Sequence, residues 1–165
     1  AAQTVAARAA EMAGKVDLVP VFQDGGVLAK ALPGYRARPQ QLEFAQAVLE
    51  TGGFTNEDSV TANNFSGIGH CDSCASGWTF PSPRLGVRAQ IQLLKSYAVK
   101  KPHYANTLVD KRLHGPAGCC QTWGDLTTVW ATDPTYGPKV MLLYSSLVQF
   151  ALDRRARGEG FEPAP

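Results

Sequence analysis

The chain has 165 residues, of which 44% are hydrophobic and 18% charged, and its formal net charge is +2. This length is most simply one domain, able to bury about two thirds of its unfolded surface. The sequence has no run of 18 apolar residues, so we expect no membrane-spanning helix. The chain begins at Ala1 and shows no apolar signal core, and we interpret it as a trimmed or mature product.

The first 38 residues predict an N-terminal helix and loop that pack on the rest of the chain. Residues 1–14 are rich in Ala and compatible with a helix, whereas residues 15–38 carry Pro and Gly residues typical of loops. The first well-marked helix begins at Pro39, a favourable first helical residue, and runs to about Glu50. The two glycines that follow Thr51 predict its end.

The middle of the chain predicts a small β element between helices. Residues 52–82 show no sustained helical period. The segments Phe65–His70 and Gly77–Phe80 are expected to pair as a short hairpin, with a Cys-x-x-Cys sequence at its tip.

A second helix is predicted after Ser82, which is a favourable N-cap, with a proline in the first turn. It should end before Lys100 and bury an apolar stripe. That stripe consists of Val87, Ile91, Leu94 and Ala98.

The last third of the chain predicts two further helices. Residues 102–122 are rich in loop-forming residues, Trp123–Trp130 predicts a short helix, and Pro138 begins a long one whose core face includes Phe150. Residues 155–165 are polar and are expected to form a flexible tail. The predicted fold class is therefore mostly α (α+β), a helical body with a small β-hairpin lobe forming a cleft.

Four cysteines lie in two tight pairs, Cys71 with Cys74 and Cys119 with Cys120. An even count fits disulfides in an oxidising compartment, and three pairings are possible. The alternative is a zinc site that adds His70, but adjacent cysteines are poor partners on a tetrahedral metal. We expect disulfides, no metal and no cofactor.

Charge is unevenly distributed along the chain. Residues 41–80 contain five acids and no Lys or Arg, whereas residues 81–114 contain seven basic residues against Asp110 alone. The basic run is either a solvated helix face or a surface that attracts a polyanion such as an anionic cell wall. No nucleic-acid-binding motif is present, so we expect no nucleic-acid partner.

Glu50 is the strongest candidate for a catalytic group, because it closes an apolar helix directly before a Gly-rich turn. A carboxyl group in such a setting is partly removed from water, which disfavours its ionised form and raises its pKa. An acid that keeps its proton near neutral pH is what general acid catalysis of glycoside cleavage requires. The alternative is that Glu50 is an ordinary surface carboxylate.

Three ordered pieces of sequence, spread over residues 39–152, resemble the bacterial glucosaminidase family that cleaves peptidoglycan, the mannosyl-glycoprotein endo-beta-N-acetylglucosaminidase-like proteins. The pieces are Leu49–Phe54 with Asn63–Gly69, then Phe80–Ala98, then Trp130–Val140. The resemblance implies a lysozyme-like fold with a catalytic domain over residues 39–154. It also implies hydrolysis of the β-1,4 bond after N-acetylglucosamine in the wall glycan.

By this resemblance Glu50 is the acid that protonates the leaving glycosidic oxygen, and Tyr136 is a catalytic partner that faces it across the cleft. The implied substrate-binding residues are Asn63, Asn64, Phe65, Trp78, Trp130 and Asp133. Structural alternatives remain for several of them. The two asparagines could be turn formers, Tyr136 a core aromatic residue and Asp133 a helix cap.

The second catalytic group is where the sequence departs from the family. The returning hairpin arm Gly77–Phe80 carries no acid, and Asp72, between the first two cysteines, is the only acid on the hairpin. We expect Asp72 to be the base, with Glu57 and Asp58 in an exposed loop. The alternatives are a water oriented without a carboxylate, help from the substrate's acetamido group, or a lytic transglycosylase that needs no water.

The leading interpretation is a monomeric peptidoglycan hydrolase, extracellular or cell-wall associated, either secreted or carried on a phage virion. Its partner would be the glycan strands of peptidoglycan. The alternatives are a muramidase or lytic transglycosylase on the same fold, a non-catalytic wall-binding module, and a zinc- or redox-dependent protein built on the four cysteines.

Overall fold

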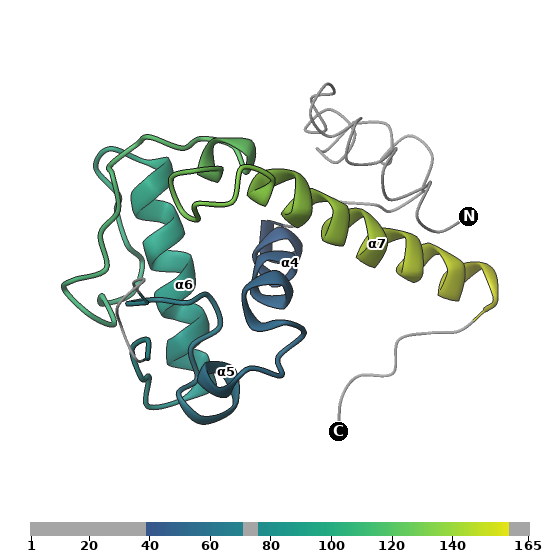
Figure 1. Ribbon diagram of the computed structural model, residues 1–165, viewed down its shortest axis with the longest axis horizontal. Coiled ribbons are helices and arrows are strands. Elements are labelled where there is room, and N and C mark those ends of the chain that lie inside the picture. The colour runs from purple at the N-terminus through teal and green to yellow at the C-terminus, as the bar shows by residue number, and fades with distance from the viewer. Residues whose placement is uncertain (1–38, 71–75, 159–165) are drawn as a thin grey trace.

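The computed structural model describes residues 39–70 and 76–158, and these ranges are mostly helical. The elements, numbered as in Figure 1, are α4 (Pro39–Thr51), α5 (Glu57–Thr61), α6 (Pro83–Ala98), the 3-10 turn η1 (Gly124–Leu126) and α7 (Tyr136–Ala156). None of the helices in the described ranges is long and apolar enough to cross a membrane. The predicted mostly α class is confirmed for this part of the chain.

The predicted β-hairpin is not confirmed. The backbone N–H of Trp78 donates to the carbonyl of Ile68 at 2.8 Å, so the two expected arms do run side by side. Neither arm is a strand, and the described ranges contain only an isolated bridge between Thr127 and Ala131. The expected tip, residues 71–75, lies outside the described residues.

The main core forms where α4 packs against the first turns of α7 (Figure 1). Tyr136, Val140 and Tyr144 are spaced by four residues, so they lie on one face of α7, and all three are buried. They meet the fully buried Ala45 of α4. A second, smaller core lies under α6 and holds Ile68, Phe80, Ala89 and Leu113.

The start of α6 is as predicted, because the Ser82 hydroxyl accepts a hydrogen bond from the Leu85 N–H. Its predicted apolar stripe is wrong for the first two positions, whereas Leu94 packs against the main core and Ala98 is half-buried. Val87 is 45% exposed and Ile91 37% exposed, whereas the buried positions hold small and amide residues. The buried residues of α6 are Gly86, Ala89, Gln90, Gln92 and Ser96. The helix lies too close to the preceding chain for large side chains, since a Cβ on Gly86 would stand 1.8 Å from the Asn63 carbonyl oxygen.

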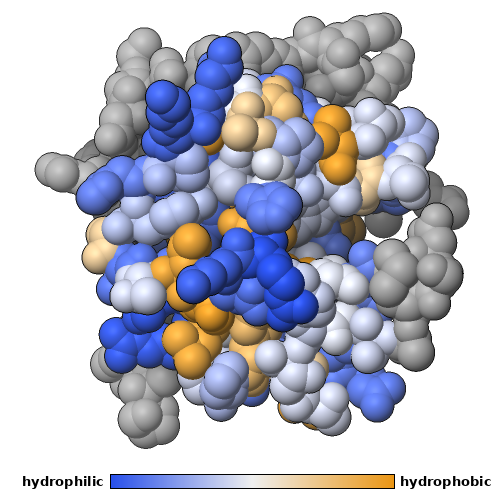
Figure 2. Space-filling model, turned by 90° about the vertical axis from the view of Figure 1, so that its left-hand side faces the viewer, coloured by the Kyte–Doolittle hydropathy of each residue, from blue (hydrophilic) through white to orange (hydrophobic). Residues whose placement is uncertain are grey.

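The exposed face of α6 borders a groove of about 330 Å³. Its basic lining residues are Arg84, Arg88 and Lys95. Figure 2 views the molecule from the side on which α6 lies in Figure 1, and hydrophobic residues there sit directly beside strongly hydrophilic ones. Attraction of a polyanion to this basic face stays a prediction.

The helix predicted over Trp123–Trp130 is wrong, since only the 3-10 turn η1 forms there. Thr128 has φ +63°, which interrupts a right-handed helix. The last helix begins at Tyr136, two residues before the predicted Pro138, because a proline within the first turn forfeits no helical hydrogen bond. Phe150, expected in the core, is 53% exposed.

The short helix α5 was not predicted. Asn56 caps it, with its side-chain oxygen accepting from the Ser59 N–H at 3.0 Å, and two acids occupy its first turn. Both features were visible in the sequence, but five residues carry too little periodicity to be recognised.

Candidate active site

Glu50 lies in the last turn of α4, where one of its carboxyl oxygens receives two hydrogen bonds. The indole N–H of Trp130 donates to Oε1 at 2.9 Å, and the hydroxyl of Tyr136 donates to the same atom at 2.5 Å. The other oxygen, Oε2, faces Gly67, where an added Cβ would stand 3.6 Å away. The described residues offer Oε2 no hydrogen-bond donor, so it is the oxygen able to carry a proton.

The environment of Glu50 favours the protonated acid. Burial raises the pKa of Glu50, and the hydrogen bonds from Tyr136 and Trp130 oppose that rise without cancelling it. Because Oε1 faces two donors, a proton on this carboxyl group belongs on Oε2. The structure therefore presents a partly buried carboxyl group whose pKa is raised and whose Oε2 is the oxygen available to a proton.

A chain of buried side chains supports Glu50 from behind. Gln90 Nε2 donates to Gln46 Oε1 at 2.9 Å, and Gln46 Nε2 donates to the Tyr136 hydroxyl oxygen at 2.8 Å. Gln46, Gln90 and Tyr136 are at most 4% exposed. Because the Tyr136 oxygen accepts from Gln46, its own proton is directed to Glu50.

Tyr136 remains a neutral donor in this arrangement. Burial raises the pKa of Tyr136 far above its usual range, and the nearby Glu50 charge adds to the effect. Sequence analysis missed Gln46 and Gln90. A signal was present for Gln46, which lies four residues before Glu50 and so on the same helix face, between two alanines.

Glu50 opens into a cavity of about 420 Å³. The cavity lies between the end of α4, the start of α5, the turn over residues 66–70, α6 and residues 130–131. Its lining residues are Glu50, Asn56, Asp58, Ser66, Gly67, Ile68, Gly69, His70, Leu93, Tyr97, Trp130 and Ala131. The rings of Tyr97 and Trp130 pack with centroids 5.2 Å apart and provide an aromatic wall.

Asp58 also lines this cavity, which corrects the expectation of an exposed loop. It lies in α5, its side chain is only 14% exposed, and its Oδ2 contacts the ring nitrogen Nε2 of His70. Glu57, the preceding residue, is exposed and is absent from the cavity lining. The sequence did not separate these two acids, because a helix of five residues is too short for its periodicity to show which side faces inward.

The predicted cleft residues Asn63, Asn64 and Phe65 do not line the cavity. Asn64 is fully buried, and its amide donates to the carbonyls of Ile68 at 2.8 Å and Trp78 at 3.0 Å. Asn63 donates to the Phe80 carbonyl at 2.8 Å. Both asparagines hold together the loop that forms the cavity wall. Phe65 packs edge-on against Phe54, with ring centroids 6.0 Å apart.

Trp78 and Asp133 also lie outside the cavity lining. The Arg112 guanidinium covers the Trp78 ring, 3.9 Å from its centroid. Asp133 pairs with Lys139 and accepts hydrogen bonds from Thr135, contacts that lower the pKa of Asp133 to about 2. Asp133 therefore sits as a charged residue at the start of α7.

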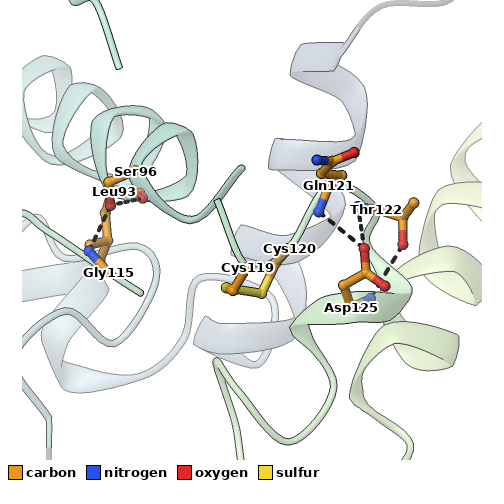
Figure 3. The surroundings of a disulfide bond; sticks show 8 residues. All are labelled: Leu93, Ser96, Gly115, Cys119, Cys120, Gln121, Thr122 and Asp125. Atoms are coloured by element: carbon orange, nitrogen blue, oxygen red, sulfur yellow. Dashed lines mark hydrogen bonds between the residues drawn. A yellow bond between two sulfur atoms is a disulfide. The ribbon is translucent and has the colours of Figure 1, made fainter. Parts of the chain in front are cut away.

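The predicted base Asp72 and the predicted disulfide cysteines Cys71 and Cys74 lie outside the described residues. Cys119 and Cys120 are disulfide-bonded to each other (Figure 3). The Cys120 N–H donates to the Tyr97 carbonyl at 3.2 Å, which ties this loop to the end of α6 beside the cavity. No cluster of three or more potential metal ligands occurs in the described ranges.

The sequence of this chain matches a known protein family. Residues 28–148 match the Glucosaminidase family, described as mannosyl-glycoprotein endo-beta-N-acetylglucosaminidase. The chain belongs to this family. The match spans α4, α5, α6 and most of α7, and with them Glu50, its hydrogen-bond partners and the whole cavity lining.

A curated relative of this glucosaminidase-family chain is an uncharacterized protein of Borreliella burgdorferi, 35% identical over 112 residues. The alignment covers 66% of this chain and 54% of the relative, so the chain spans about half the length of the relative it matches. No solved structure gave a significant match.

Proposed function

We propose that this protein is a peptidoglycan hydrolase that cleaves the β-1,4 bond after N-acetylglucosamine, with Glu50 as the general acid. The observation that carries the proposal is the carboxyl group itself. It is partly buried, its pKa is raised by burial, and it opens into a cavity with one oxygen held by Tyr136 and Trp130. Family membership supports the glycan as substrate.

The acid step uses the free oxygen of Glu50. The proton on Oε2 passes to the glycosidic oxygen as the bond from that oxygen to the anomeric carbon breaks. Tyr136 and Trp130 then stabilise the carboxylate left behind, because both already donate to Oε1 and need not reorganise. The buried amides of Gln46 and Gln90 keep Tyr136 in the orientation that this requires.

Two features of the cavity suit a sugar. The Tyr97 and Trp130 rings provide apolar surface on which the C–H face of a pyranose can pack. The cavity also presents carboxylate oxygens of Glu50 and Asp58 without hydrogen-bond donors among the described residues, and these can accept hydrogen bonds from sugar hydroxyls. The proposal places the protein outside the cell or at the cell wall, where this substrate occurs.

The test is digestion of purified peptidoglycan by the wild type and by Glu50→Gln, with mass spectrometry of the released fragments. Reducing N-acetylglucosamine ends that disappear in the variant support the proposal. Anhydro-sugar ends would instead identify a lytic transglycosylase, and reducing N-acetylmuramic acid ends a muramidase. If the protein sediments with the wall but releases nothing, it is a binding module.

A further inference from the structure

Two carboxyl groups line the cavity, and each has one oxygen occupied and one free. Glu50 Oε1 accepts hydrogen bonds from Trp130 and Tyr136, and Asp58 Oδ2 contacts the His70 ring. Neither Glu50 Oε2 nor Asp58 Oδ1 has a hydrogen-bond partner among the described residues. The two groups come from different helices, α4 and α5, and the cap residue Asn56 joins them by donating to the Glu50 carbonyl at 3.3 Å.

From this arrangement we infer that Asp58 is the catalytic base that activates water for the hydrolysis assigned to Glu50. The inference rests on the proposed function. Protein-bound water needs two to four polar partners, and the cavity supplies one in Asp58 Oδ1, with the sugar hydroxyls of a bound substrate as further partners. His70 holds the Asp58 carboxylate in place, because its ring contacts the opposite oxygen.

The reaction balances with these two groups and one water. Glu50 Oε2 gives its proton to the glycosidic oxygen, and the bond from that oxygen to the anomeric carbon breaks. The water oxygen forms the new bond to that carbon from the opposite face, and the water proton passes to Asp58. The acid and the base then exchange their protons with solvent. An attack of this kind inverts the anomeric centre, so the first product is the α-anomer.

Glu57 provides a matched control. It is the same kind of group on the same helix turn, but it is exposed and lies outside the cavity lining. A purely electrostatic effect of removing one acid from α5 should therefore appear in both variants. A role in catalysis should appear only at Asp58.

The experiment measures kcat and KM for the wild type, Asp58→Asn, Glu57→Gln and Glu50→Gln on soluble peptidoglycan fragments. We expect Asp58→Asn to lower kcat by about 100-fold or more with KM nearly unchanged, since general bases contribute roughly this much. Glu57→Gln should stay within about twofold of the wild type, well inside the tenfold that corresponds to 1.36 kcal/mol in the barrier.

Proton NMR of the fresh wild-type product is a second test that needs no variant. The α-anomer supports the inference. The β-anomer, or an Asp58→Asn kcat within about tenfold of the wild type, overturns it and leaves the Glu50 proposal intact. A wild type that releases no fragment overturns both proposals.

Discussion

Removing the Tyr136 hydroxyl should show how strongly the buried, hydrogen-bonded side chains behind Glu50 are coupled to its carboxyl group. Tyr136→Phe keeps the ring in the core but deletes two hydrogen bonds, one of 2.5 Å to Glu50 and one of 2.8 Å from Gln46. The fully buried Gln46 amide is then left with an unpaired donor, which costs about 1–3 kcal/mol. The hydrogen bond to an ionised Glu50 contributes about 1.5–3 kcal/mol more.

We therefore expect Tyr136→Phe to lower the free energy of unfolding by about 2.5–6 kcal/mol at a pH where Glu50 is ionised. The loss should shrink at low pH, because a hydrogen bond to the neutral acid contributes only about 0.5–1.5 kcal/mol. The same variant should shift the alkaline limb of the pH–rate profile to higher pH. The reason is that the Tyr136 hydrogen bond lowers the pKa of Glu50, so that its removal raises this pKa.

The assay is urea-induced unfolding at several pH values, with the m-value compared between variants. Tyr104→Phe is the matched control, since its hydroxyl makes one long bond, 3.3 Å, to the Gln92 carbonyl outside the cavity. That variant should lose at most about 1.5 kcal/mol, independently of pH. A Tyr136→Phe loss no larger than that of the control, or one that does not grow with pH, would refute the coupling.

The other predictions concern the charge on Glu50, the turn at Gly69 and the cysteine pair. Because burial raises the pKa of Glu50 above 4.5, the folded state binds more protons than the unfolded state between 4.5 and the folded-state pKa, so stability falls as pH rises through that window. In chemical denaturation, Glu50→Gln should therefore be at least as stable as the wild type near pH 8. The difference in unfolding free energy between the two should vanish below about pH 4. A variant less stable than the wild type at pH 8 contradicts this. Gly69→Ala should destabilise more than Gly53→Ala, since both have φ +80° but only at Gly69 would the Cβ meet Trp78, at 2.0 Å. Thermal denaturation should show a Gly53→Ala loss of about 1–2 kcal/mol from backbone strain alone, and equal losses would argue against the packing at Gly69. Replacing the exposed Cys119 by serine, which leaves the buried Cys120 in the main core, should change the unfolding free energy by less than about 1 kcal/mol, because a link between neighbours restrains little of the unfolded chain. A loss of several kcal/mol would instead indicate pairing with Cys71 or Cys74, which peptide mapping of the unreduced protein would reveal.

Local features of the sequence were sufficient for several helix ends and for the raised pKa of Glu50. Pro39, the glycines after Thr51 and the Ser82 cap act through contacts within a few residues, so the bounds of α4 and the start of α6 follow from them. The setting of Glu50 at the end of an apolar helix likewise predicted a raised pKa, and burial does raise it.

Pairings between distant segments decided everything else about the site. Trp130 and Tyr136 meet Glu50 from 80 and 86 residues away, and Gln90 meets Gln46 from 44 residues away. Asp58 lines the cavity and contacts His70 from the turn on its other side, and Val87 and Ile91 stay exposed on a helix whose Gly86 lies against the Asn63 backbone. A local pattern reports which residue types could be buried. Only the packing of helices on each other decides which of them are, since burial depends on contacts that no short segment makes by itself.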